Sequence, residues 1–162
     1  MQANLDDFGL TARAVSELLG TVLGEKLGAG VSREVFTSPI DPSVVFKVEA
    51  YSRIDERLGF QNVEEYLTWK DLEGCKEYAR WLAPCKAISS SGIILVQHRA
   101  DPIPKDFPLP EEMPDFLTDF KRANYGLLDG QLVCLDYGLN RFRQVGSRSK
   151  KVKMRKVLWR DS

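Results

Sequence analysis

The chain has 162 residues, of which 43% are hydrophobic and 10% aromatic. This length predicts one domain, and the apolar content is sufficient for a hydrophobic core of its own. Basic and acidic side chains are equal in number but unevenly placed: residues 1–140 carry 14 basic and 22 acidic side chains, and residues 141–162 carry nine and one. The sequence therefore predicts an acidic body with a basic C-terminal tail over residues 141–162.

Targeting and metal-binding signals are missing from the sequence. It holds no apolar run of about 18 residues, as a transmembrane helix requires, and residues 1–9 are polar and lack the pattern of a signal peptide. Cys75, Cys85 and Cys134 form no CxxC motif, and His98 is the single histidine. These features make a zinc site improbable and predict a cytoplasmic protein with reduced thiols.

The first predicted element is a helix over residues 11–22. Thr11 is a good N-cap residue, and apolar side chains recur on one face of the segment. The members of that face are Val15, Leu18, Leu19 and Val22. We expect this face to pack on the sheet that follows.

Residues 24–48 predict three strands. Gly28-Ala29-Gly30 separates two short strand-like runs, and residues 38–43 form a turn before the apolar run Val44–Val48. Glycines at a hairpin tip allow backbone N–H groups to approach phosphates closely, although such tips are more often simple turns. Lys47 lies inside the apolar run, where it is either a surface lysine of an edge strand or a phosphate ligand.

Residues 60–98 predict a helix, a shorter helix and a hairpin. The first helix spans 60–72, with Val63, Leu67 and Trp69 at partial helical spacing, and the second spans 75–82, before Pro84. Strands at 85–88 and 93–97 flank a Ser-Ser-Ser-Gly turn. Together with the three earlier strands they predict a five-stranded antiparallel sheet with one packed helix.

The remaining body is rich in proline and then in turn residues. Five prolines between residues 101 and 114 exclude a long helix there. We expect a short helix over 114–123 that turns Phe116, Leu117 and Phe120 toward the core. Asp129-Gly130 predicts a turn before a strand over 131–135, and Asp136-Tyr137-Gly138 follows that strand.

The order of these motifs resembles that of the protein-kinase-like family. In this sequence the glycine-rich tip is Gly28 and Gly30, and the D-x-x-x-x-N motif runs from Asp119 to Asn124. Asp136-Tyr137-Gly138 corresponds to the family's D-F-G motif. The resemblance implies one α+β domain: an N-terminal helix (1–23), a kinase-like N-lobe (24–98), a much reduced C-lobe (99–140) and the basic tail (141–162).

The resemblance also implies ATP and Mg²⁺ as cofactors and a role for each matching residue. The phosphates would meet the glycine-rich tip and Lys47, and Lys47 would pair with Glu65 or, as a second choice, Glu64. The backbone of the segment Gln97-His98-Arg99 would bind adenine. Asp119 would accept the proton of the attacking hydroxyl, Lys121 would face the transferred phosphoryl group, and the metal ligands would be Asn124 and Asp136.

Departures from the family pattern leave three functions open. Arg33 replaces the third glycine, Leu117-Thr118 stand where the family has a pair such as His-Arg, and 24 residues follow Gly138. The first function is transfer of phosphate from ATP to a hydroxyl acceptor, as in serine/threonine kinases, with a protein as the expected acceptor. The second is a pseudokinase-type module that inhibits or recruits a partner, similar to short kinase-like proteins of bacteria and their phages. The third is binding of nucleic acid or of an acidic protein through residues 141–160. Such a basic run is most often a solvated tail, and it could also bind this protein's own acidic body.

Overall fold

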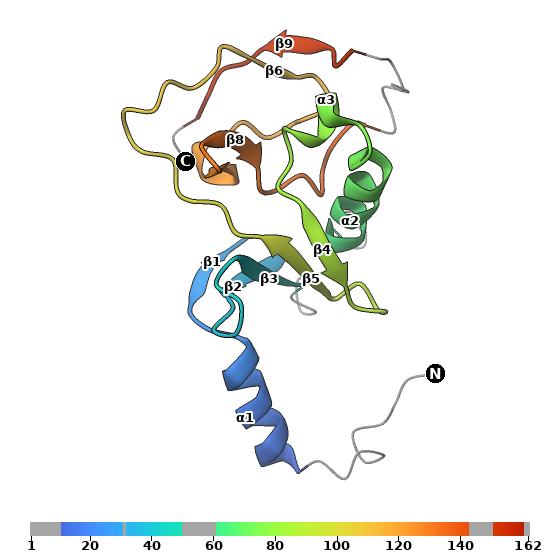
Figure 1. Ribbon diagram of the computed structural model, residues 1–162, viewed down its shortest axis with the longest axis vertical. Helices are drawn as coiled ribbons and strands as arrows, with labels where there is room; N and C mark the ends of the chain where they lie inside the picture. The colour runs from blue at the N-terminus through green and yellow to red at the C-terminus, as the bar shows by residue number, and fades with distance from the viewer. Residues whose placement is uncertain (1–10, 31, 50–60, 143–150, 161–162) are drawn as a thin grey trace.

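The computed structural model describes residues 11–30, 32–49, 61–142 and 151–160 (Figure 1). It is an α+β protein built on a five-stranded antiparallel sheet with strand order β1-β2-β3-β5-β4. The predicted fold class and the predicted five-stranded sheet are confirmed at this level. Within the described ranges, no helix has both the length and the apolar character needed to cross a membrane.

The sheet takes its order from three hairpins and a helical crossover. Its strands are β1 (Lys26–Ala29), β2 (Arg33–Thr37), β3 (Val44–Glu49), β4 (Cys85–Ile88) and β5 (Ile94–His98). Strand β3 lies at the centre, between β2 and β5, and four of its six residues are buried. Its apolar, β-branched sequence suits that central position. Lys47 is one of the four and is 4% exposed, which excludes a surface lysine on an edge strand.

Helix α1 (Ala12–Val22) begins as predicted but packs differently. The Thr11 side chain accepts a hydrogen bond from the Ala14 amide at 3.2 Å. No residue of α1 is buried, Leu18 and Leu19 are each 52% exposed, and the helix projects away from the sheet (Figure 1). The predicted packing on the sheet is wrong. The Gly24 amide, two residues after the helix, donates a hydrogen bond to Thr37 O at 2.9 Å. The chain therefore enters the sheet directly after α1, and no loop is left that could turn the helix back onto the sheet.

Helix α2 (Gln61–Leu72) lies against the sheet with a largely polar buried face. The partial helical spacing of Val63, Leu67 and Trp69 does not mark that face: Leu67 is 38% exposed, and Val63 and Trp69 are only partly buried. The buried positions instead hold polar side chains that have partners in the sheet and in the segment after β8. The buried residues are Gln61, Asn62, Glu65, Thr68 and Leu72. Helix α3 (Lys76–Ala79) is shorter than the predicted 75–82.

After β5, the described residues form two small sheets and contain no helix longer than a single turn. Strand β6 (Glu112–Pro114) pairs with β9 (Met154–Lys156), and η3 (Arg122–Asn124) leads into the hairpin of β7 (Tyr125–Leu128) and β8 (Gln131–Cys134). The helix expected over 114–123 is absent. Its three apolar side chains are nevertheless buried as predicted: Phe116, Leu117 and Phe120 are 2%, 1% and 7% exposed.

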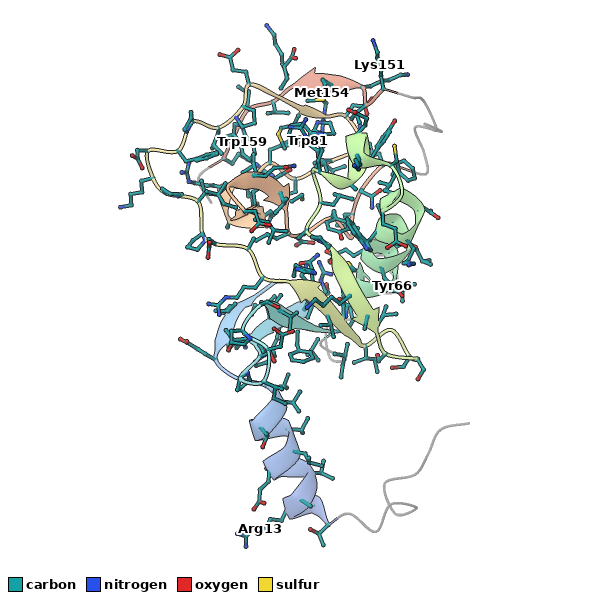
Figure 2. The ribbon with its side chains drawn as sticks, viewed as in Figure 1. Arg13, Tyr66, Trp81, Lys151, Met154 and Trp159 are labelled. Atoms are coloured by element: carbon teal, nitrogen blue, oxygen red, sulfur yellow. The ribbon has the colours of Figure 1, made fainter. Side chains whose placement is uncertain are left out.

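The described part of the basic tail, residues 151–160, docks on the body. Besides forming β9, it places Trp159 against Phe120 and Tyr125 with edge-to-face ring geometry (Figure 2). The Trp159 Nε1–H donates to Pro110 O at 2.8 Å. Of the targets predicted for this segment, the protein's own acidic body is the one that the structure supports for these residues.

Candidate functional site

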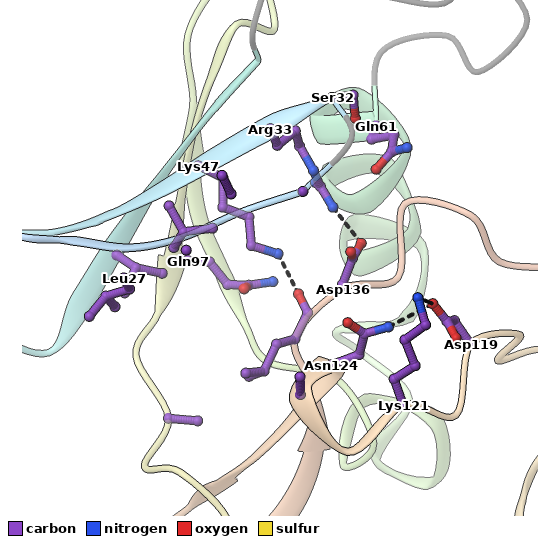
Figure 3. A pocket seen from close by; sticks show the side chains of 18 of the residues that line it. Leu27, Ser32, Arg33, Lys47, Gln61, Gln97, Asp119, Lys121, Asn124 and Asp136 are labelled. Atoms are coloured by element: carbon purple, nitrogen blue, oxygen red, sulfur yellow. Dashed lines mark hydrogen bonds and ion pairs between the residues drawn. The ribbon is translucent and has the colours of Figure 1, made fainter. Parts of the chain in front are cut away.

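One cavity of about 580 Å³ lies between the five-stranded sheet and residues 118–139 (Figure 3). This volume is within the range of small-molecule sites. Four Lys or Arg side chains and two carboxylates line the cavity, so its wall is net cationic and suits an anionic ligand. The predicted site residues that line it are Gly28, Gly30, Lys47, Gln97, His98, Asp119, Lys121, Asn124 and Asp136. The structure therefore brings together residues that lie more than 100 positions apart in the chain.

Lys47 reaches from the central strand to helix α2 and to the end of β8. Its Nζ donates to Glu65 Oε2 at 2.8 Å and also to the Leu135 carbonyl. The predicted pairing of Lys47 with Glu65 is present, and Glu64, the second choice, does not make it. Because Leu135 directly precedes Asp136, this contact fixes the cation beside the D-Y-G segment.

Arg33, which stands in the place of the third glycine, contacts several of the site's charged side chains. Its side chain is 6% exposed and donates to Glu65 Oε1 at 2.8 Å and to Asn62 Oδ1 at 3.2 Å. It also forms an ion pair with Asp136 Oδ1. The residue in the position of the third glycine is thus a buried cation that bridges the helix glutamate and the predicted metal ligand.

The charges in this network determine the protonation of Glu65. Burial alone would raise the pKa of this fully buried carboxyl, but Arg33 and Lys47 and their hydrogen bonds outweigh burial and lower the pKa to about 2. Burial also disfavours the charge on Arg33, but Glu65 and Asp136 outweigh that effect and raise the pKa of the guanidinium above its ordinary value. Both groups are therefore charged at neutral pH.

Asn62 fixes this network to the sheet. Its side-chain amide donates to Lys47 O at 3.0 Å and to Ile93 O at 2.8 Å, while its backbone amide donates to Glu49 Oε1 at 2.8 Å. With its Oδ1 accepting from Arg33, every polar group of this fully buried side chain is used. Asn62 positions the site, and it was missing from the sequence prediction.

Asp119, Lys121 and Asn124 form a second cluster at the opposite wall of the cavity. Asn124 Nδ2 donates to Asp119 Oδ2 at 2.9 Å, and Lys121 Nζ lies 3.8 Å from the same oxygen. The other oxygen, Oδ1, pairs with Arg160 from the C-terminal segment. Leu135 N donates to Asn124 O at 2.7 Å, which connects this cluster to the first.

The Asp136-Tyr137-Gly138 segment turns one side chain toward the cavity and the next into the core. Asp136 lines the cavity with 47% of its side chain exposed, whereas Tyr137 is 1% exposed and donates from its hydroxyl to Ala83 O at 2.7 Å. The Tyr137 amide donates to Glu65 Oε1 at 3.1 Å. A Cβ on Gly138 would lie 2.8 Å from Gln61 Cβ, so only glycine allows this approach to α2.

Gly28 and Gly30, in the β1–β2 tip, make no close contact of the kind that requires glycine at position 138. Neither Gly28 nor Gly30 has a positive φ, and an added Cβ would meet nothing within 4 Å at Gly28 and only Arg33 O, at 3.7 Å, at Gly30. Folding therefore does not require glycine at either position. The absence of side chains instead leaves this edge of the cavity open.

The segment after β5 offers fewer backbone donors than predicted. Gln97 is buried, the His98 amide donates to Pro84 O and the Arg99 amide donates to Ser43 O, each at 2.8 Å. Ala100 is the first residue here whose amide donates no hydrogen bond within the described part of the chain, and it lines the cavity. Burial, and then the charge of Lys86, lower the pKa of His98, so its imidazole is neutral at physiological pH.

The oxygen donors in the cavity fit a magnesium ion that is shared with phosphates. Within the described residues, Asp136 Oδ2 and Asn124 Oδ1 accept no hydrogen bond. The described part of the chain contains no group of three or more Asp, Glu, His or Cys side chains that could hold a metal ion. One carboxylate and one amide oxygen are too few for a site built by protein alone. They are sufficient where phosphate oxygens and water complete the octahedron.

Sequence reasoning missed two further site residues besides Asn62. Arg33 was noted only as a departure from the glycine pattern, and Arg160 only as part of a basic tail. The predicted strands could have identified Arg33, because it lies on the strand that pairs with the strand of Lys47. The local sequence gives no indication that Arg160 pairs with Asp119. Comparisons with protein-family models and with curated proteins find no match to this chain.

Proposed function

We propose that this protein binds ATP with Mg²⁺ in the cavity and transfers the γ-phosphoryl group to a hydroxyl acceptor, as protein kinases do. The observation that carries the proposal is that one cavity holds the open glycine tip, Lys47, and the Asp119, Asn124 and Asp136 side chains. Phosphoryl transfer requires mainly the positioning of groups and the neutralisation of charge, and these residue types supply both. A kinase-like N-lobe with a much reduced C-lobe is the corresponding fold proposal.

Each residue has a role in this proposal. The tip at Gly28 and Gly30 covers the phosphates, Lys47 pairs with their α/β oxygens while Glu65 holds its ammonium, and the Ala100 amide meets the adenine edge. Asp136 and Asn124 would hold Mg²⁺, which would supply neutralisation of the phosphate charge. Asp119 accepts the proton of the acceptor hydroxyl, and Lys121, 3.8 Å from it, faces the transferred group.

The experiment first measures thermal stabilisation by ATP with Mg²⁺ and then transfer of labelled γ-phosphate, with autophosphorylation as the first acceptor reaction. Lys47→Ala should abolish stabilisation, and Asp136→Asn should abolish transfer. Lys86→Ala and Asp129→Asn are matched controls, because both residues lie outside the cavity and Asn tolerates the positive φ of Asp129. Wild-type transfer by Asp136→Asn would refute the mechanism.

A second candidate function is a binding module that holds nucleotide or a partner without transfer. The specific observation in its favour is that an arginine already pairs with each catalytic aspartate, Arg33 with Asp136 and Arg160 with Asp119. Stabilisation by nucleotide without γ-phosphate transfer would support it. Nucleic-acid binding remains a third proposal, for which the exposed Lys153 and Lys156 are available. A steep loss of binding with salt would identify it.

A further inference from the structure

Residues 115–124 carry three site side chains, Asp119, Lys121 and Asn124, on a segment with little regular structure. The single turn η3 is its only helical element. A loop that must hold catalytic groups to within a fraction of an ångström requires rigid support from its surroundings. That support comes from residues 151–160, which we name the C-terminal strap.

The strap holds this loop through backbone hydrogen bonds at two of its residues, Lys153 and Arg160. Asp115 N donates to Lys153 O at 2.9 Å, Arg160 N donates to Phe120 O at 2.9 Å, and Arg122 N donates to Arg160 O at 3.0 Å. These bonds fix the loop on both sides of Asp119. The first of these bonds extends the antiparallel β6–β9 ladder, in which Pro114 pairs with Met154, and the other two form a parallel bridge between Lys121 and Arg160.

Side chains of the strap fix the loop from the core side as well. The Trp159 ring contacts Phe120 and Tyr125 at centroid distances of 5.9 and 4.9 Å. Arg155 donates to Leu117 O at 2.7 Å and lies over the Phe120 ring at 4.9 Å. Edge-to-face aromatic pairs and a cation over a ring each add stabilisation beyond area burial. Leu158, between these contacts, is 91% exposed.

Arg160 brings the strap into the site itself. Its guanidinium pairs with Asp119 Oδ1, while Asn124 and Lys121 hold Oδ2. Both oxygens of the carboxylate are therefore oriented by named donors from two parts of the chain. A guanidinium has fixed donor directions, so it holds a carboxylate in one orientation better than an ammonium does.

We propose that the C-terminal strap is the scaffold of the 115–124 loop and that Arg160 is a positioning residue for Asp119. The scaffold role stands on the contacts alone, whereas the positioning role rests on the proposed phosphotransferase function. The predicted basic tail is, over these residues, a structural part of the site.

Hydrogen–deuterium exchange of the full-length chain tests the scaffold role. Trp159→Ala should raise exchange in peptides that cover 115–124 by about tenfold or more, with β3 and β5 unchanged. Leu158→Ala, the matched control, should leave both regions as in the wild type. Unchanged exchange over 115–124 would overturn the proposal. If Trp159→Ala does not fold, Arg160→Gln carries the same test, with faster exchange confined to residues 119–124 as the supporting result.

Kinetics of Arg160 variants test the positioning role. Arg160→Gln should keep the ATP affinity within about twofold and lower the transfer rate about tenfold, and Arg160→Lys should recover part of the rate. Wild-type transfer by Arg160→Gln, or an equal loss of affinity and rate, would overturn it. If the wild type binds ATP but transfers nothing, the proposed function fails, and the exchange experiment still decides the scaffold role.

Discussion

The buried carboxylate of Glu65 is the best place to test the energetics of the site. Glu65→Gln keeps the size of the side chain and removes its charge. The substitution removes the negative charge that Lys47 and Arg33 share and turns one of the two carboxylate oxygens into an NH2 donor, so one of these cations loses its acceptor at position 65. Lys47 keeps the Leu135 carbonyl, and Arg33 keeps Asp136 and Asn62. Since Glu65 is fully buried and both cations are almost fully buried, water cannot replace the lost carboxylate.

Two routes give the size of the effect. Arg33 and Lys47, acting against burial, lower the pKa of Glu65 from 4.5 to about 2. At 1.36 kcal/mol per pKa unit, this difference corresponds to about 3 kcal/mol of folding stability at neutral pH. Removal of one partner of a buried ion pair costs about 3–5 kcal/mol in measured cases. We therefore expect Glu65→Gln to lower the free energy of unfolding at pH 7 by about 3–5 kcal/mol.

The pH dependence has a definite sign. Because the pKa of Glu65 is lower in the folded than in the unfolded state, the stabilisation is complete above pH 4.5 and is lost as the pH falls from 4.5 toward 2. Glu49, whose pKa burial raises, contributes with the opposite sign, but it does so above pH 4.5 and therefore outside the range in which Glu65 titrates. In Glu65→Gln the Glu65 part of the slope should disappear.

Urea unfolding followed by tryptophan fluorescence at pH 7, 5, 4 and 3 measures both quantities. Glu64→Gln is the matched control, since it makes the same chemical change one residue away, on a side chain that is not fully buried. We expect the control to stay within about 1 kcal/mol of the wild type. If Glu65→Gln matches the wild type in stability and slope, or if the control loses more, the assigned charge network is wrong.

Three further predictions concern the metal, the thiols and the close approach at Gly138. Arg33→Gln should raise the affinity for Mn²⁺, a probe for Mg²⁺, by about tenfold in isothermal titration, because Asp136 loses a competing cation; weaker or unchanged binding would contradict this. Burial raises the pKa of Cys85 to about 12 and that of Cys134 further. At pH 8 a thiol reagent should therefore modify only Cys75 in the native protein, and all three cysteines in urea. Modification of Cys134 in the native protein would show that this thiol is not buried. Gly138→Ala should destabilise by about 1–3 kcal/mol through its contact with Gln61, whereas Gly20→Ala, in open space on α1, should be neutral or stabilising; equal melting temperatures for the two variants would exclude the clash.

Local chemistry made the strands and turns of this protein predictable. Asp129 and Gly130 have φ values of 52° and 78°, and few other residue pairs accept two positive φ angles in a two-residue hairpin turn. The Ser-rich turn with Gly92, whose φ is also 78°, sets the β4–β5 hairpin in the same way. The spacing from Gly30 through the β2–β3 hairpin then placed Lys47 correctly on a strand between neighbours.

The face of α2 was unpredictable from hydrophobic periodicity because the helix buries polar side chains. The buried residues Asn62, Glu65 and Thr68 recur at helical spacing, as the residues of a buried helix face do. They are polar, however, and a search for apolar residues at this spacing misses them. Buried polar residues need partners, and those partners come from distant parts of the chain: Arg33, Asn140 and the Ile93 carbonyl. A polar stripe on a helix that faces a sheet is itself a signal of a functional site.

Backbone hydrogen bonds with a distant part of the chain also determine the conformation of residues 114–123. Its apolar spacing at Phe116, Leu117 and Phe120 suits a helix, and all three side chains are buried. The backbone instead bonds with the strap: Asp115 with Lys153, and Arg122 with Arg160. Helical hydrogen bonds join residues only a few positions apart, so helix propensity can be judged from residues 114–123 alone. The competing backbone hydrogen bonds come from a segment about 40 residues later, which the local sequence does not reveal.

The choice between transfer and simple binding depends on two arginines that differ in burial. The Arg33 side chain is 6% exposed and has Glu65 and Asn62 as further partners, so it keeps its position if Asp136 turns toward a metal. The Asp136 side chain is 47% exposed and can rotate on the surface of the cavity at low cost. Under the proposed function, Asp136 would hold the metal through Oδ2, which accepts no hydrogen bond within the described residues, and Arg33 would stay in place. Arg33 would then be a buried positive charge beside the phosphates of the proposed ligand, which makes the proposed transfer compatible with the loss of the third glycine.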